Sequence, residues 1–124
     1  MAWTLEERRT RRSSERHVAL RYQLEHTRER GGLRAVVLAD GDGLAVVSAG
    51  DHVMGEELAA LAPLMASSPF GVRLSPLLRG LEVAVRPLVL NGQQLYLATV
   101  GGSMARDAVL AHSVQGVRRI LASN

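Results

Sequence analysis

Hydrophobic and polar positions form blocks along the chain, and each block has its own periodicity. Residues 5–30 are mostly charged or polar and include neither glycine nor proline. An apolar stripe appears only in the second half of this block, where Leu20, Leu24 and Thr27 follow the i, i+4, i+7 spacing of one helix face. The pattern predicts a helix that ends at the two glycines 31–32, with a first half that is solvated or frayed.

Two segments have the pattern of β-hairpins. The first, "LRAVVLADGDGLAVVSAG" (residues 33–50), has consecutive apolar positions on both sides of Asp and Gly residues. The second, "LEVAVRPLVLNGQQLYLATVGG" (residues 81–102), contains Asn91-Gly92, a strong signal for a two-residue turn. Strands without polar alternation are typical of a sheet covered on both faces, so we expect helices on both sides of the first hairpin. Pro87 indicates an edge position or a bulge, because proline cannot donate to a sheet ladder.

The sequence "DGDG" at residues 40–43 contains aspartates typical of a calcium loop but lacks the spacing of one. An EF-hand loop needs a ligand at position 5, glycine at position 6 and glutamate at position 12. Counted from Asp40, these positions hold Leu44, Ala45 and Asp51. Asp and Gly also tolerate positive φ. We therefore interpret the motif as a hairpin turn and expect no metal.

The segment "MGEELAALAPLMAS" (residues 54–67) predicts a second helix. Asp51 precedes it as a possible N-cap, and Pro63 within it predicts a kink or a break. The larger apolar residues, which we expect to cover the sheet, are Leu58, Leu61 and Met65. The small ones, which we expect to form a smooth outer face that another helix can approach, are Ala59, Ala60, Ala62 and Ala66.

The last helix is predicted over residues 103–122. Its apolar positions repeat with the spacing i, i+4, i+7, i+11, at Leu110, Val114, Val117 and Leu121. Between the second helix and the second hairpin, residues 70–74 could add a short strand. The predicted order is helix, hairpin, helix, possible strand, hairpin, helix, which is an α+β architecture.

Composition restricts the chemistry that the chain can perform. Its 124 residues suffice for one domain, and the absence of cysteine excludes disulfides, thiolate metal sites and cysteine catalysis. All fifteen basic residues are arginine, which removes P-loop lysine and Schiff-base chemistry. No signal peptide is visible, and no apolar run reaches the roughly 18 residues of a membrane span. We expect a soluble, cytoplasmic protein.

Positive charge is concentrated near the N-terminus. Residues 1–34 hold nine arginines against five glutamates, whereas the rest of the chain is close to neutral. Such an arm could contact nucleic acid, an anionic membrane surface or an acidic protein. Glutamates dilute it and no aromatic residues interleave it, so a solvated helical extension is the preferred interpretation of residues 1–16. The arginines of this arm are Arg8, Arg9, Arg11 and Arg12.

No motif indicates catalysis. Ser48, Asp51 and His52 have the residue types of a triad, but five positions are too few for triad geometry without a special turn, and G-x-S-x-G is absent. The four histidines lack metal-ligand spacing. Glycines 101–102 could bind an anion before a helix, yet a tight strand-to-helix turn explains them. We expect no catalytic, cofactor or metal residues and a non-enzymatic protein.

The order and content of these segments resemble the roadblock family, the domain of the dynein roadblock light chain and its bacterial relatives. "GGLRAVVLADGDGLAVVS" is similar to the family's first hairpin, and "EELAALAPLMAS" occupies the place of its second helix. "LEVAVRPLVLNGQQLYLATVGG" and "VLAHSVQGVRRILA" correspond to the final strand pair and the closing helix. The resemblance covers about residues 17–122, so we divide the chain into an extension (1–16) and a roadblock-like domain (17–124).

The resemblance implies a roadblock/profilin-like antiparallel sheet of about five strands, with the first and last helices on one face and the second helix on the other. It also implies a homodimer formed through the second helix and a neighbouring edge strand. The bacterial members bind small Ras-like GTPases as activating or scaffold proteins in signalling. The expected interface residues are Glu57, Ala59, Ala60, Leu61, Ala62, Leu64, Met65 and Ala66.

Three functions remain open from the sequence. The main expectation is a homodimeric adaptor that binds a small Ras-like GTPase and modulates its nucleotide cycle or its localisation. The alternative is a module that binds nucleic acid or an anionic surface through the arginine arm. A third possibility is a small-ligand sensor built on the same fold.

Overall fold

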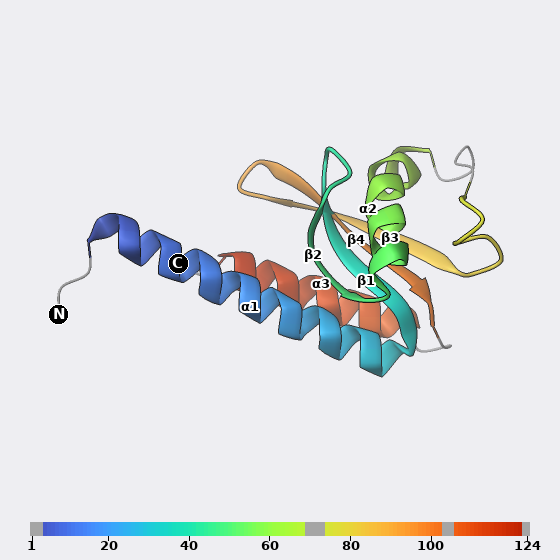
Figure 1. Ribbon diagram of the computed structural model, residues 1–124, viewed down its shortest axis with the longest axis horizontal. Helices are drawn as coiled ribbons and strands as arrows, with labels where there is room; N and C mark the ends of the chain where they lie inside the picture. Colours follow the sequence, from blue (N-terminus) through green and yellow to red (C-terminus); the bar gives the residue numbers. More distant parts are fainter. Residues whose placement is uncertain (1–3, 69–73, 103–105, 123–124) are drawn as a thin grey trace.

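A computed structural model describes residues 4–68, 74–102 and 106–122 (Figure 1). The chain has seven elements over these residues. In order they are α1 (Leu5–Gly31), β1 (Leu33–Asp40), β2 (Ala45–Gly50), α2 (His52–Ser67), β3 (Val83–Leu90), β4 (Gln93–Gly101) and α3 (Arg106–Ala122). Their sequence is the predicted one, helix–hairpin–helix–hairpin–helix.

The strands form one antiparallel sheet in the order β2-β1-β4-β3. Helices α1 and α3 pack together on one face, and α2 lies across the other (Figure 1). The α+β fold class is therefore confirmed. The described part of the chain contains four strands against the expected five or so. The proposed strand at residues 70–74 falls almost wholly outside the described residues, and its last residue, Leu74, is not in a strand.

Each face of the sheet has its own core. Between the sheet and the α1/α3 layer the core includes Leu20 and Leu24 of α1, Val36 and Leu38 of β1, and Leu97 of β4. Between the sheet and α2 it includes the other side of β1 and β4. The main residues of this second core are Ala35, Val37, Ala39, Leu58, Ala62, Leu78 and Ala98.

Helix α1 is one continuous helix of 27 residues, so the extension is helical from Leu5 onward. Thr4 and Glu7 form a capping box, with the Thr4 hydroxyl accepting from the Glu7 amide (3.1 Å) and the Glu7 carboxylate accepting from the Thr4 amide (3.1 Å). At the other end, Gly32 adopts the left-handed conformation (φ 61°) that terminates many helices. The predicted glycine stop is confirmed.

The predicted apolar stripe of α1 is confirmed as its buried side. Leu20, Leu24 and Thr27 are all buried. The Thr27 hydroxyl shares a buried hydrogen bond with the Ser113 hydroxyl of α3 (2.7 Å). This bond satisfies two polar groups that would otherwise be costly inside the α1/α3 layer.

The two strands of the first hairpin differ in burial. Residues 35–39 of β1 are fully buried, as expected for a strand covered on both faces. The same expectation for β2 is wrong, because β2 is an edge strand and its Ala45 and Val46 are exposed. Apolar runs therefore predicted the environment of the central strand but not that of its neighbour.

Both predicted turns are confirmed. The Asp40 carboxylate accepts from the amides of Asp42 (2.9 Å) and Leu44 (3.0 Å), so its oxygen serves the backbone of the turn. Asn91 and Gly92 both have positive φ (53° and 78°), which a tight hairpin turn requires. Pro87 lies on β3, an edge strand among the described residues, as its missing N–H demands.

Helix α2 begins where its cap predicts. The Asp51 carboxylate accepts from the Met54 amide at 2.9 Å. A kink or a break was expected at Pro63, and the break does not occur, since α2 continues through the proline to Ser67. Proline removes one donor and crowds the carbonyl of Ala59, and contacts of α2 with the sheet hold the helix together despite this cost.

Gly43 brings the hairpin tip against α2. Its φ is 80°, and a Cβ at this position would lie 3.2 Å from Ala60 Cα. We expect Gly43→Ala to lower the free energy of unfolding by about 1–2 kcal/mol, since an L-residue is strained at positive φ and would push on α2. Chemical denaturation monitored by circular dichroism measures this loss.

Gly41→Ala is the matched control, two residues away in the same turn. Gly41 has no positive φ, and a Cβ there would meet no atom within 4 Å. This variant should be neutral or slightly more stable. Equal losses for both variants would contradict the packing of the hairpin tip on α2.

Candidate protein interface on helix α2

The buried side of α2 is made of small as well as large residues. Its buried residues are Met54, Gly55, Leu58, Ala59 and Ala62. The prediction that Ala59 and Ala62 face outward is therefore wrong. Leu61 and Met65, expected to cover the sheet, are only partly buried at the flanks of the contact. Ala59 and Ala62 share the second core with Leu58 of the same helix and with alanines of β1.

The exposed side of α2 carries a narrow line of residues that we call the outer stripe: Val53, Glu57, Ala60 and Leu64. They follow i, i+4, i+7, i+11 and so share one helix face. Val53 and Leu64 expose 59% and 56% of their surface, which is high for large aliphatic side chains. Of the predicted interface residues, Glu57, Ala60, Leu64 and Ala66 are exposed.

Val53 was missed from the sequence. Its spacing from Ala60 and Leu64 was the available signal, but α2 was expected to begin one residue after it. The observed helix begins at His52, which places Val53 in the first turn.

A second segment helps α2 to cover this face of the sheet. Leu78 is fully buried, and Leu74 and Leu81 pack around it against the α2-side core. Residues 74–81 therefore cover apolar surface of the sheet that α2 alone would leave exposed. Val89 of β3 remains 55% exposed, and its register opposite Gln94 places it on the α2 side of the sheet.

The residue types of a triad have separate structural roles. Asp51 caps α2, and His52 Nε2 lies 3.0 Å from Glu56 Oε1 within the same helix. Ser48 faces Gly55, with 3.6 Å between the Ser48 Cβ and a Cβ built on the glycine. Among the described residues, no group of three or more His, Asp or Glu side chains is arranged to hold a metal ion.

The arginine arm is part of a helix that projects past the sheet. Arg8, Arg9, Arg11 and Arg12 lie in the first turns of α1, which extend beyond the other elements in Figure 1. Arg11 pairs with Glu15 at 2.9 Å, an exposed i, i+4 contact that adds little stability. Over the described part of the chain, no helix combines the length and apolar character needed to cross a membrane.

The glycines before the last helix have the conformation of a tight turn. Gly101 and Gly102 both have positive φ (84° and 117°). Residues 103–105, the proposed helix start, lie outside the described residues.

Comparison with known proteins identifies the fold. No protein-family model matches the chain, and no curated protein matches it. Among solved structures, the chain is similar to Myxococcus xanthus MglB, with a TM-score of 0.57 and 14% sequence identity over 85% of this chain and 96% of that one. At such an identity the likeness concerns the fold alone. The chain has an α+β fold of the roadblock type, with an antiparallel sheet between helices.

The orientation of α2 can be tested with one substitution at two positions. Ala62→Arg should prevent folding or remove most of the stability, because Ala62 is fully buried against the sheet and a buried unpaired charge costs several kcal/mol, or about half of a domain's stability. Ala60→Arg should keep the native circular dichroism spectrum, because Ala60 is exposed. If Ala62→Arg folded and Ala60→Arg did not, the opposite side of α2 would have to face the sheet.

Proposed function

We propose that this protein is a non-enzymatic homodimeric adaptor that binds a small Ras-like GTPase and modulates its nucleotide cycle or its localisation. The observation that carries the proposal is the outer stripe, which exposes Val53, Ala60 and Leu64 beside Glu57 on the helix that the roadblock resemblance assigns to assembly. The roadblock-type fold supports it further. Location in the cytoplasm belongs to the same proposal.

The outer stripe has the composition of a helix–helix contact. Glu57 and Ala60 lie between Val53 and Leu64. A partner helix could therefore approach closely over Ala60, with Glu57 beside it, and pack against an aliphatic side chain at each end. Large exposed aliphatic residues on one face are a common mark of an interface. In the dimer that we propose, two α2 helices meet through these residues, with Leu61, Met65 and Ala66 at the margin.

Ala60→Arg should convert the dimer to a folded monomer, because the arginine fills the centre of the proposed contact. Multi-angle light scattering would report half the mass of the unmodified protein. Ala111→Arg is the matched control, since Ala111 is exposed on α3, on the other side of the sheet. It should leave the mass unchanged. If the Ala60→Arg protein is still a dimer, α2 does not form the interface.

The surface of the paired α2 helices is where we place the GTPase. An adaptor of this kind acts on nucleotide hydrolysis by repositioning the switch loops of the GTPase itself. An arginine supplied in trans can also stabilise the transition state of phosphoryl transfer. No feature of the sequence singles out one arginine for this role, so the proposal does not assign one.

The arginine arm favours a second candidate function. Arg8, Arg11 and Arg12 are exposed on a helix that projects from the domain, which suits contact with nucleic acid or an anionic surface. Binding of this kind depends steeply on salt, because each neutralised phosphate releases counterions. A docked protein interface depends on salt much less.

Deletion of residues 1–14 separates the two functions. The truncated protein keeps the buried stripe of α1, so it should still fold and dimerise. On the adaptor proposal it should still bind the GTPase, with at most a slower association rate, since a basic arm steers encounter more than it holds a complex. Titration of both forms against a Ras-like GTPase loaded with GDP or a GTP analogue measures this.

The same titrations against duplex DNA and anionic vesicles, at low and moderate salt, complete the comparison. On the arm hypothesis, the full chain binds one of these tightly and the deletion abolishes that binding. If this occurs and neither form binds the GTPase, the adaptor proposal is wrong.

A further inference from the structure

The two edge strands of the sheet are protected very differently. Exposed strand edges pair readily with other chains, and proteins commonly block them with charged residues, proline or bulges. β3 carries Arg86 and Pro87 in its middle. β2, with the sequence AVVSAG, has neither a charged residue nor proline, although it is the outer strand on its side of the sheet. Its pairing with β1 shifts register between Leu38 and Ala39, which leaves Val46 without a partner near the start of the strand. The regular part of this edge, residues 47–50, is open to strand pairing.

Exposed apolar side chains gather around this open edge. On the α1 side they are Val18 and Tyr22, and at the start of β2 they are Leu44 and Val46. Tyr22 is 75% exposed, the highest fraction among the exposed large hydrophobic residues of the described part of the chain. Exposed tyrosine beside aliphatic residues is typical of protein interfaces.

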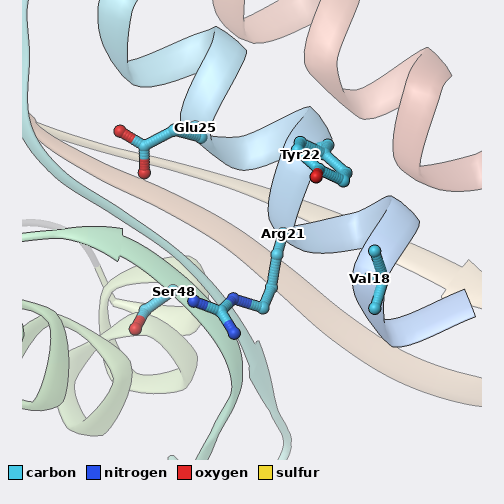
Figure 2. A pocket seen from close by; sticks show the side chains of 5 residues that line it. All are labelled: Val18, Arg21, Tyr22, Glu25 and Ser48. Atoms are coloured by element: carbon cyan, nitrogen blue, oxygen red, sulfur yellow. The ribbon is translucent and has the colours of Figure 1, made fainter. Parts of the chain in front are cut away.

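A groove runs between α1 and β2. One part of it encloses about 290 Å³ and is lined by Val18, Arg21, Tyr22, Glu25 and Ser48. Figure 2 shows the Arg21 side chain extending from α1 toward Ser48 of β2, while Tyr22 and Val18 project from α1 beside it. A second part follows β2 from Ala45 to Gly50, between α1 and the start of α2. The groove thus borders the whole length of the strand.

Among the described residues that line the groove, Arg21 is an arginine without a charge partner. Glu25 accepts from the Arg28 guanidinium (2.8 Å from Nε), and Glu56 pairs with His52. Arg21 lines both parts of the groove and has no hydrogen bond or ion pair within the described residues. A ligand that enters here meets an arginine whose fork of donors suits a carboxylate.

We infer that β2 binds an extended segment of another protein, which adds a strand to the sheet and places an Asp or Glu side chain on Arg21. Backbone hydrogen bonds to the open edge supply affinity, and Arg21 with the apolar groove supplies specificity. A second copy of this chain that paired through its own β2 suits the site less well, because the sequence AVVSAG has no acidic residue to place on Arg21. This inference goes beyond the GTPase proposal and does not depend on it.

Selection of a random octapeptide display library against the full-length protein tests the inference. The enriched peptides should carry an acidic residue flanked by β-branched or aromatic residues. A synthetic copy of the best peptide should protect the amides of residues 45–50 from hydrogen exchange. N-methylation of alternate peptide amides should abolish binding for one of the two alternations, because a strand pairs through one edge only. Failure to enrich such peptides, or protection elsewhere, would overturn the inference.

Charge exchange tests the role of Arg21. Arg21→Glu should weaken the acidic peptide about tenfold or more, and replacing the peptide's acid by lysine should restore binding to this variant. Arg119→Glu on α3, which packs on α1 and β3, is the control and should change nothing. Equal effects of the two variants would mean that the peptide responds only to net charge.

Two measurements separate this inference from the other proposals. Ala60→Arg, which should break the α2 dimer, should leave peptide binding unchanged. If exchange at residues 45–50 instead slows as the concentration of the protein alone rises, a second copy occupies the edge and the inference is wrong. Loss of GTPase binding has no bearing on either result.

Discussion

Burial of β1 on both faces is the constraint on which the rest of the structure depends. Residues 35–39 are fully buried, with Val36 and Leu38 toward α1 and α3, and with Ala35, Val37 and Ala39 toward α2. Buried backbone groups must be hydrogen-bonded, so β1 requires a strand on each side. β2 and β4 fill these places, and helices on both faces complete the burial. Each fully buried Val or Leu contributes about 1.5–3 kcal/mol.

Small residues determine how α2 sits on this sheet. Alanines of β1 and β4 face Ala59 and Ala62 of α2 across the second core. Leu58 lies among them in the same core, and the hairpin tip at Gly43 reaches the helix as well. The consequence lies on the other side of α2. Its outer face retains only a narrow apolar stripe, which suits contact with one further helix.

The layer on the opposite face is fixed by specific contacts between α1 and α3. Besides the Thr27–Ser113 hydrogen bond, Gly116 of α3 lies against Gln23 of α1, so close that a Cβ there would lie 2.4 Å from the amide oxygen. α1 packs over β1 and β2, and its N-terminal half runs past the sheet. Its Arg21 lies beside the edge of β2. The two surfaces that we propose for partners, the outer stripe of α2 and the edge of β2, are therefore separate.

The sequence determined the elements and their order because those signals are local. Glycine after α1, Asp51 before α2 and Asn91-Gly92 between β3 and β4 each act within a few residues, through backbone conformation or a single hydrogen bond. The stripes of α1 and α3 likewise needed only their own periodicity. The roadblock resemblance added the layer arrangement, which the structure also has.

Some elements have apolar residues on every face, and for these only the tertiary structure decided which side is buried. In α2 both leucine and alanine could have faced the sheet. Leu58, Ala59 and Ala62 do so, whereas Leu64 faces outward. In β2 the apolar run suggested a central strand. Whether a strand lies at the edge depends on which strands pair with β1, and the sequence of one strand does not specify that pairing. For the same reason, the sequence did not reveal the edge of β2 or its groove. The residues of the groove come from α1, β2 and α2 and meet only once the sheet has formed.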